Sequence, residues 1–259
     1  MTNINTAPNK YDLEMMNQYK MTFDYHTHTP FSHGKGSVLE NVKVAKEKGL
    51  EAVAISDHGP GHLSYGIKIR ELDEMRRQID EATKVYKMPV YMSVECNIIN
   101  KYPYIDVDKE LSSKFDFLIG GYHYGVFHGY CVGNYLVNKG FSPFSLDRKL
   151  MVKNTEMTVK ALYENNLKIL THPGDKGPFD IGEIAEVCAK TGTWMEISTW
   201  HKNLTVEEIK IASKRDVSFI ISSDAHTANR VGSFLGGLKR AAQAGLDFDR
   251  IVNIEKIVK

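Results

Sequence analysis

Seven short apolar segments alternate with longer amphipathic ones along this chain, and this alternation restricts the possible folds more than any other feature. Short apolar runs between helical periods are typical of parallel strands that helices cover. The cap pairs Ser37 with Glu40 and Thr205 with Glu208 mark two of the helix starts. The strands are expected at residues 22–27, 52–56, 90–94, 117–121, 168–171, 194–198 and 218–222.

The sequence predicts a single domain. Its 259 residues lie within the range of α/β barrels, and 42% hydrophobic with 25% charged residues are ordinary values for a globular protein. No linker, low-complexity segment or close repeat interrupts the alternation. We therefore expect an α/β fold in which residues 21–259 form one barrel domain. Residues 1–20 would be an N-terminal extension, with one short helix at 11–20, and a last helix would cover about 230–244.

Charge and cysteine content exclude several classes of protein. The net charge of +1 gives no global electrostatic footprint for nucleic acid. The cysteines Cys96, Cys131 and Cys188 lie far apart, which argues against a disulfide framework and a cysteine zinc site and fits a reducing compartment. No signal-peptide core or membrane-length apolar run is present. We therefore expect a soluble cytoplasmic protein without a membrane or nucleic-acid partner.

Side chains of the kind that bind metals stand at the carboxyl ends of six of the seven predicted strands. In a parallel barrel these ends converge on one face, where barrel enzymes place their active sites. An open sheet would hold the same residues too far apart to share ions, so a closed or nearly closed barrel is favoured. The residues are His26, His28, His58, Glu95, His123, His172, Asp224 and His226.

This set combines imidazoles with the carboxylates of Glu95 and Asp224 and includes no thiolate. Such ligands suit zinc, manganese or iron. Eight or more candidates exceed the four positions of one tetrahedral ion, so we expect a multinuclear site. The pair His26 and His28 alone is equally compatible with a solvated strand face, and the repetition at other strand ends favours the metal site.

Five short motifs resemble those of the PHP (polymerase and histidinol phosphatase) family, and within it most closely the YcdX-type bacterial phosphatases. The resemblance covers about residues 22–254, and the motifs agree in order and residue types. It implies a distorted (β/α)7 TIM-like barrel, in agreement with the strand count reached above. The motifs are His26-Thr27-His28, Ser56-Asp57-His58-Gly59-Pro60, Glu95-Cys96-Asn97-Ile98, Thr171-His172-Pro173-Gly174 and Ser223-Asp224-Ala225-His226-Thr227.

The resemblance also implies a trinuclear site, usually of zinc or manganese, in which Glu95 bridges two ions. His33, beyond the first strand, would reach a different ion from the histidines of that strand. This chain carries every ligand of the implied set. The three groups are His26, His28, Glu95 and Asp224; Glu95, His123 and His172; and His33, His58 and His226.

Such a site predicts a reaction. Three divalent ions carry six positive charges, of which Glu95 and Asp224 would offset two, so the pocket would favour an anion such as phosphate. Clustered ions lower the pKa of a bridging water and stabilise the attacking and leaving oxygens. The sequence therefore predicts a phosphatase that hydrolyses a small-molecule phosphate ester by metal-activated hydroxide, with Glu95 and Asp224 at its catalytic centre.

Other residues near the ligand motifs are candidates for supporting roles. His201, after the sixth strand, either orients phosphate or protonates the leaving group, or is an ordinary surface histidine. His62 and Arg230 either bind substrate phosphate or are ordinary surface side chains. Asp57 precedes a ligand and could hold it in place. The segment 126–146, rich in Gly, Tyr and Phe, is either a lid that faces the substrate or a surface excursion.

Four other functions stay open at this point. A histidinol-phosphate phosphatase shares much of the motif set, and the loops would decide between substrates. A PHP-type nuclease is opposed by the neutral charge and the lack of a basic track with interleaved aromatic residues. An amidohydrolase would usually need a bridging lysine where this chain has Glu95. A non-catalytic metal-binding PHP module is opposed by the complete ligand set.

Overall fold

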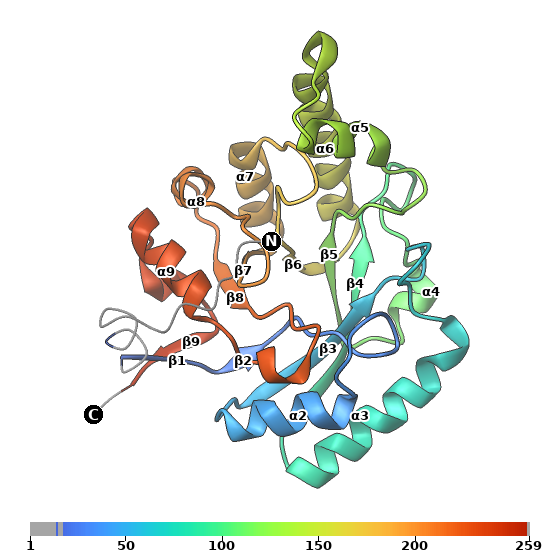
Figure 1. Ribbon diagram of the computed structural model, residues 1–259, viewed down its shortest axis with the longest axis vertical. Coiled ribbons are helices and arrows are strands. Elements are labelled where there is room, and N and C mark those ends of the chain that lie inside the picture. Colours follow the sequence, from blue (N-terminus) through green and yellow to red (C-terminus); the bar gives the residue numbers. More distant parts are fainter. Residues whose placement is uncertain (1–13, 15–17, 258–259) are drawn as a thin grey trace.

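The computed structural model describes residue 14 and residues 18–257. All seven predicted strands are present in it and form one parallel sheet in the order β2-β3-β4-β5-β6-β7-β8 (Figure 1). Each strand pairs with the next one along the chain, which is the order of a barrel. The strands are β2 (Phe23–Asp24), β3 (Ala52–His58), β4 (Val90–Asn97), β5 (Phe117–Gly121), β6 (Leu167–Leu170), β7 (Trp194–Ser198) and β8 (Phe219–Ser222).

Helices between successive strands pack around the outside of the sheet (Figure 1). Both predicted capping boxes are present, at Ser37 with Glu40 and at Thr205 with Glu208. None of the described helices is long and apolar enough to span a membrane. The helices are α2 (Val38–Glu47), α3 (Leu72–Tyr86), α4 (Lys109–Ser112), α5 (Cys131–Asn138), α6 (Leu146–Glu164), α7 (Ile181–Thr191), α8 (Val206–Ala212) and α9 (Leu235–Ala244).

The barrel closes between the segments that follow its first and last strands. The pairing of β2 with β3 covers only two residues, fewer than the predicted strand at 22–27. Beyond these two residues the pairing becomes irregular: the Ser56 N–H donates to the Thr27 carbonyl over 2.8 Å, and the Ser56 hydroxyl donates to the Tyr25 carbonyl over 2.7 Å. Further on, Thr27 forms a parallel bridge with Ala225 across the seam. The motif His26-Thr27-His28 therefore lies where the nearly closed seven-stranded barrel closes.

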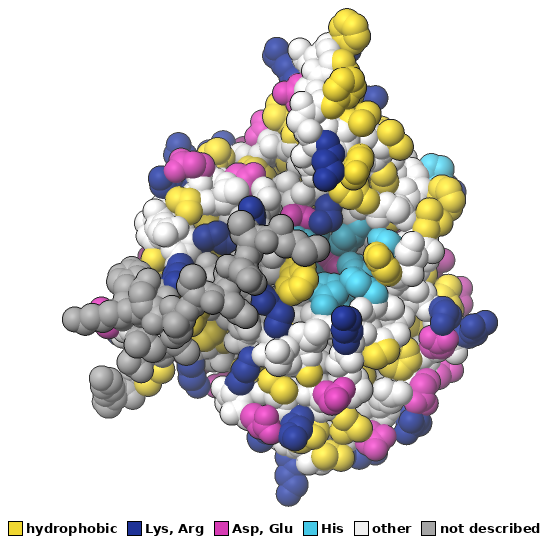
Figure 2. Space-filling model, viewed as in Figure 1, with side chains coloured by type: hydrophobic (Ala, Val, Ile, Leu, Met, Phe, Trp, Pro, Cys, Tyr) yellow, Lys and Arg dark blue, Asp and Glu magenta, His cyan; other side chains and the backbone are white. Residues whose placement is uncertain are grey.

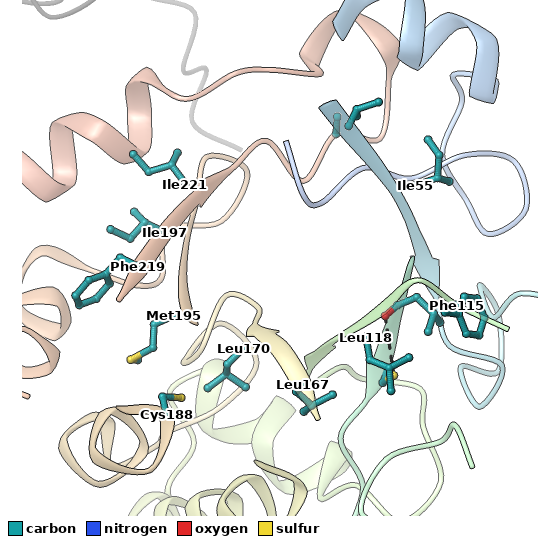
Figure 3. Packing of buried hydrophobic residues seen from close by; sticks show 14 of the residues in the cluster. Ile55, Phe115, Leu118, Leu167, Leu170, Cys188, Met195, Ile197, Phe219 and Ile221 are labelled. Carbon is teal, nitrogen blue, oxygen red and sulfur yellow. Dashed lines mark hydrogen bonds between the residues drawn. The ribbon is translucent and has the colours of Figure 1, made fainter. Parts of the chain in front are cut away.

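Alternation along the strands separates an outer from an inner layer of side chains. Outward side chains pack against the helices, as Leu170 and Met195 do opposite Cys188 of α7 (Figure 3). On β7, Trp194 and Glu196 alternate with Met195, so both point into the barrel. The inner apolar cluster consists of Ile119, Ile169 and Ile220, with Tyr25, Phe117 and Trp194 packed against it. This cluster forms the floor below the polar residues at the carboxyl ends of the strands.

The last helix begins later than predicted. A short 3-10 turn at 228–230 is followed by Gly232, whose φ of +73° interrupts the helical backbone. The helix α9 therefore begins at Leu235 rather than near residue 230.

The N-terminal helix predicted at 11–20 is wrong at its end, whereas residue 14 is helical. Residues 19 and 20, expected at the end of a helix, belong to the strand β1 (Tyr19–Met21). This strand pairs antiparallel with β9 (Ile254–Lys256), with Tyr19 opposite Lys256 and Met21 opposite Ile254. Apart from residues 14 and 18–20, the predicted extension 1–20 lies outside the described residues.

The segment 126–146 leaves the barrel after β5 and contains α5 (Figure 1). It carries exposed apolar side chains, among them Phe127, Val132 and Phe144. These side chains are available to a second molecule, and the role of the segment as a lid stays a prediction.

Candidate metal centre

Nine side chains at or after the carboxyl ends of six strands meet in one cluster, as predicted. Histidine side chains gather in a hollow on this face of the molecule, with hydrophobic side chains beside them (Figure 2). Most of the nine are buried, whereas His33 and His226 are partly exposed. The nine are His26, His28, His33, His58, Glu95, His123, His172, Asp224 and His226.

Glu95, near the end of β4, lies at the centre of the cluster. Its Oε1 lies 2.9 Å from His172 Nε2 and 3.3 Å from His123 Nε2. Its Oε2 lies 2.9 Å from His58 Nδ1 and 3.3 Å from His26 Nε2. The two oxygens thus face different histidines, which is the arrangement that a bridging carboxylate needs.

Asp224, after β8, faces the histidines of the first motif. Its Oδ1 lies 3.2 Å from His28 Nε2 and 3.7 Å from His26 Nε2, and the two ring nitrogens are 3.0 Å apart. The backbone is left-handed at Asp224, with a φ of +48°, and at His172, with a φ of +27°. Left-handed backbone is uncommon outside glycine and clusters at functional sites, where the surrounding structure imposes it.

A third group lies on the more open side of the cluster. His28, His58 and His226 place ligand atoms within 4.8 Å of one another. The ring centre of His33 is 4.3 Å from that of His226 and 4.9 Å from that of His58. Burial, together with His226 and His58, lowers the pKa of His33 to about 3, so this ring is neutral at pH 7. The residues of the implied third group, His33, His58 and His226, therefore lie close to one another. His28 lies between this group and Asp224.

The donor set fits divalent cations. Several buried atoms of the cluster have no hydrogen-bond partner among the described residues, including Glu95 Oε2, Asp224 Oδ1 and His58 Nδ1. Unpartnered buried polar atoms are costly, and a shared ion would satisfy them together. Burial would raise the pKa of Glu95, but His26, His123 and His58 lower it well below its ordinary value. Glu95 is thus an anion ready to bind cations.

Asp57, expected to hold a ligand, organises the loop that leads to His33. Its Oδ1 accepts the Thr29 N–H over 2.8 Å and its Oδ2 accepts the Thr29 hydroxyl over 2.5 Å. The Ser32 hydroxyl also donates to it. His28 Nδ1 lies 4.0 Å from Asp57 Oδ1, beyond hydrogen-bond distance. Asp57 therefore stabilises the loop between the candidate ligands His28 and His33.

Sequence reasoning missed Asn97, Asp106 and Glu196, which contact the histidines directly or through another residue. Asn97 Oδ1 accepts the Nδ1–H of His123 over 2.9 Å, and Asp106 accepts the side-chain N–H of Asn97 over 2.6 Å. Glu196 accepts the Nδ1–H of His26 over 2.7 Å. A signal for Glu196 was present, because it is the one charged residue within its apolar strand segment. Asn97 belongs to the motif Glu95-Cys96-Asn97-Ile98.

His201, a candidate catalytic residue, lies between two carboxylates. Its Nδ1 is 3.0 Å from Asp175 Oδ1, and its Nε2 is 3.1 Å from Asp224 Oδ2. Burial opposes the charged form, but hydrogen bonds to Asp175 and Asp224 raise the pKa of His201 to about 9. The ring is therefore cationic at neutral pH, which suits proton donation or attraction of an anion. Possible ligand atoms of His172, Asp175 and His201 also lie within 4.8 Å of one another.

His62 and Arg230, the candidate phosphate ligands, occupy different surroundings. The ring of His62 is centred 5.5 Å from that of His58, and its Nδ1 accepts the Tyr65 N–H over 3.1 Å. Burial and nearby histidines lower the pKa of His62 to about 4, so the neutral ring carries its proton on Nε2. The guanidinium of Arg230 lies 4.7 Å from the centre of the Trp200 ring. Both can donate to an anion.

The chain is similar to known proteins over most of its length. The family model of the PHP domain matches residues 24–202. A probable phosphatase of Thermoanaerobacter sp. (strain X514) is 28% identical over 251 residues and covers 91% of each chain. A probable phosphatase of Proteus mirabilis (strain HI4320) is 29% identical over 242 residues and covers 89% of each chain.

Two solved structures share the fold. A candidate histidinol phosphatase of Listeria monocytogenes has a TM-score of 0.64 at 16% identity and covers 82% of this chain and 98% of its own. The histidinol phosphate phosphatase of Lactococcus lactis, solved with zinc, L-histidinol and phosphate, has a TM-score of 0.57 at 16% identity. That comparison covers 88% of this chain and 95% of the other.

Proposed function

This chain belongs to the PHP domain family, and on that premise we propose that it is a metal-dependent phosphatase acting on a small-molecule phosphate ester. Relatives that share about nine-tenths of its length and are named probable phosphatases support this class of reaction. The observation that carries the proposal is the convergence of histidines from different strands on Glu95.

The proposed centre holds three divalent ions, with zinc as the first expectation and manganese or iron as the others. Bound ions of this kind supply a water of lowered pKa and positive charge for the phosphate oxygens. Glu95 is the bridge between two of the groups, because its Oε2 faces His26 and its Oε1 faces His172. The groups are His26, His28, Glu95 and Asp224; Glu95, His123 and His172; and His33, His58 and His226.

Arg230 and His62 are the proposed ligands of the substrate phosphate. Arg230 forms no ion pair with a carboxylate among the described residues. Its Nη2 donates to the Thr199 carbonyl over 3.3 Å, and its Nε has no hydrogen-bond partner there. A guanidinium without a carboxylate partner, beside a histidine cluster, favours an anion and suits binding of phosphate. His62 adds a neutral Nε2–H donor, because its Nδ1 already accepts from the Tyr65 backbone.

His201 is the proposed proton donor to the leaving oxygen. It is held by Asp175 at Nδ1, which leaves Nε2 on the side of Asp224 and the cluster. A protonated imidazole at this position can transfer its proton when the ester bond breaks. The exposed apolar side chains of segment 126–146 would contact the part of the substrate beyond the phosphate.

Metal analysis combined with phosphatase assays tests the proposal. The protein purified with its ions should contain about three per chain and hydrolyse phosphomonoesters. A panel that includes sugar phosphates, nucleotides and histidinol phosphate would separate the substrates, and single-stranded DNA would report a nuclease. Fully loaded protein that hydrolyses no phosphate ester would contradict the proposal and favour a non-catalytic metal-binding module.

A further inference from the structure

Glu196 is a fully buried carboxylate inside the barrel for which the proposed reaction has no use. Its Oε1 accepts the Nδ1–H of His26 over 2.7 Å, and its Oε2 accepts the backbone N–H of His172 over 2.7 Å. Because an ionised carboxylate only accepts hydrogen bonds, the proton shared with His26 lies on Nδ1. The opposite ring nitrogen of His26 is then directed at Glu95 and His28, at 3.3 and 3.0 Å.

The two residues that Glu196 contacts belong to different ion groups. His26 faces Asp224 and His28, whereas His172 faces the other oxygen of Glu95. The ring centres of His26 and His172 are 6.0 Å apart, with Glu196 behind both residues. One carboxylate thus holds a side chain that follows β2 and a backbone amide that follows β6.

Two other histidines of the cluster also form a hydrogen bond through their Nδ1, and each has its own partner. His123 donates from Nδ1 to Asn97, and His226 contacts the backbone carbonyl of Asp224 over 2.9 Å. Glu196 differs from these partners because it serves two candidate ligands at once. A hydrogen bond on the outer nitrogen fixes the ring orientation and tautomer of a metal-binding histidine.

We propose that Glu196 is a positioning residue that couples two of the three ion groups by fixing His26 and His172 together. This inference rests on the proposed metal centre and deepens it. Removing the double acceptor would weaken the ions bound through His26 and through His172, and it would leave the group of His33, His58 and His226 intact.

The substitution Glu196→Gln isolates this role because it preserves the shape of the side chain. Glutamine has one acceptor oxygen and one NH2 donor group, whereas His26 and His172 both present N–H donors. One of the two donors must therefore face another donor, or the ring of His26 must move its proton to Nε2, where it would block a metal. Glu196→Asp keeps two acceptors on a shorter side chain and should restore part of the function.

The experiment measures metal affinity and amide exchange rather than activity alone. Competition with a chromogenic chelator should show two ions bound about 10- to 100-fold more weakly in Glu196→Gln and one ion bound as in the wild type. The exposed Glu186 of α7 offers a matched control, since Glu186→Gln makes the same chemical change outside the barrel and should alter none of the three affinities. Thermal unfolding of the metal-free proteins checks that both variants fold.

A second readout is independent of metal. In the metal-free wild type, the His172 amide and the His26 Nδ1 proton should exchange slowly with solvent, and at least one should exchange faster in Glu196→Gln. Wild-type affinity for all three ions in this variant, or an equal loss of all three, would overturn the proposal. Failure of the wild type to bind ions would instead refute the proposed function, while the exchange measurement would still report whether Glu196 holds both residues.

Discussion

Glu95 contacts histidines from several parts of the chain and so has a central place in the candidate site. It is buried, it contacts histidines from four different segments, and its two oxygens face different groups. The sequence alone showed that Glu95 belongs to a motif and that His26, His123 and His172 are candidate ligands elsewhere in the chain. The identity of its neighbours at each oxygen was not, because that depends on how the strands are staggered.

Glu95→Ala should abolish the bridge. We expect hydrolysis to fall to background and two of the three ions to be lost, because both proposed groups that share Glu95 lose a ligand. Metal content by mass spectrometry and the rate with a phosphomonoester measure the two effects. Glu47→Ala, on the exposed side of α2, is the control and should change neither. A variant with a full complement of ions would contradict the bridging role.

His201 makes the stability of the metal-free protein depend on pH. Its pKa is raised from 6.5 to about 9 in the folded chain, so its contribution is fully present below pH 6.5 and is lost as the pH rises through 9. The contribution is on the order of 3 kcal/mol at most. Urea unfolding with a chelator present should show wild type more stable than His201→Gln at pH 6. The two should converge above pH 9, and a constant difference would contradict the assignment.

At the scale of elements, the ends of the strands decide where chemistry is possible. Gly121 ends β5 directly beside the centre, and a Cβ there would clash with Thr171 Oγ1 and lie 3.0 Å from Glu95 Oε1. Thr171 itself donates to Glu95 Oε1 over 2.7 Å. The close approach of two strand ends around one carboxylate therefore requires glycine at this position.

Gly121→Ala should displace Glu95 as well as destabilise the chain. We expect a loss of about 1–3 kcal/mol of unfolding free energy from overpacking, together with strongly reduced metal binding. Gly236→Ala, at an exposed position in α9 with only one contact at 3.9 Å, is the matched control. That substitution should be neutral or slightly stabilising, since alanine favours a helix by up to about 1 kcal/mol. Urea unfolding and metal titration measure both variants.

At the scale of the whole molecule, the centre ties the barrel together. Its residues come from chain segments nearly 200 positions apart, and some of them flank the bridge between Thr27 and Ala225 that closes the barrel. Ions that bind the folded chain in preference to the unfolded one would shift the folding equilibrium by mass action.

Addition of zinc to metal-free protein should therefore raise its thermal midpoint. At a free concentration about one hundred times the dissociation constant, one site adds about 2.7 kcal/mol to the unfolding free energy. Differential scanning fluorimetry over a zinc series measures the shift, and magnesium at the same concentrations is the control because it binds histidines poorly. No shift with zinc, manganese or iron would contradict a metal centre in this cluster.

The sequence alone determined the strand–helix alternation, the barrel class and the side chains that converge at one end. It did so because short apolar runs, cap pairs and residues at strand ends are local patterns that depend on neighbouring positions only. The strand predicted at 22–27 is shorter in the structure, because its pairing with β3 becomes irregular after Asp24. The helix predicted at about 230–244 begins later, after a left-handed glycine.

Only the tertiary structure decided which groups meet. Glu196 contacts His26 across 170 positions of the chain, and Asp175 and Asp224 enclose His201 from two separate loops. Such contacts depend on the closure of the barrel and on the alternation of side chains inside it, so no local pattern contains them. For the same reason, charges such as that of His201 follow from neighbours that only the folded chain brings together.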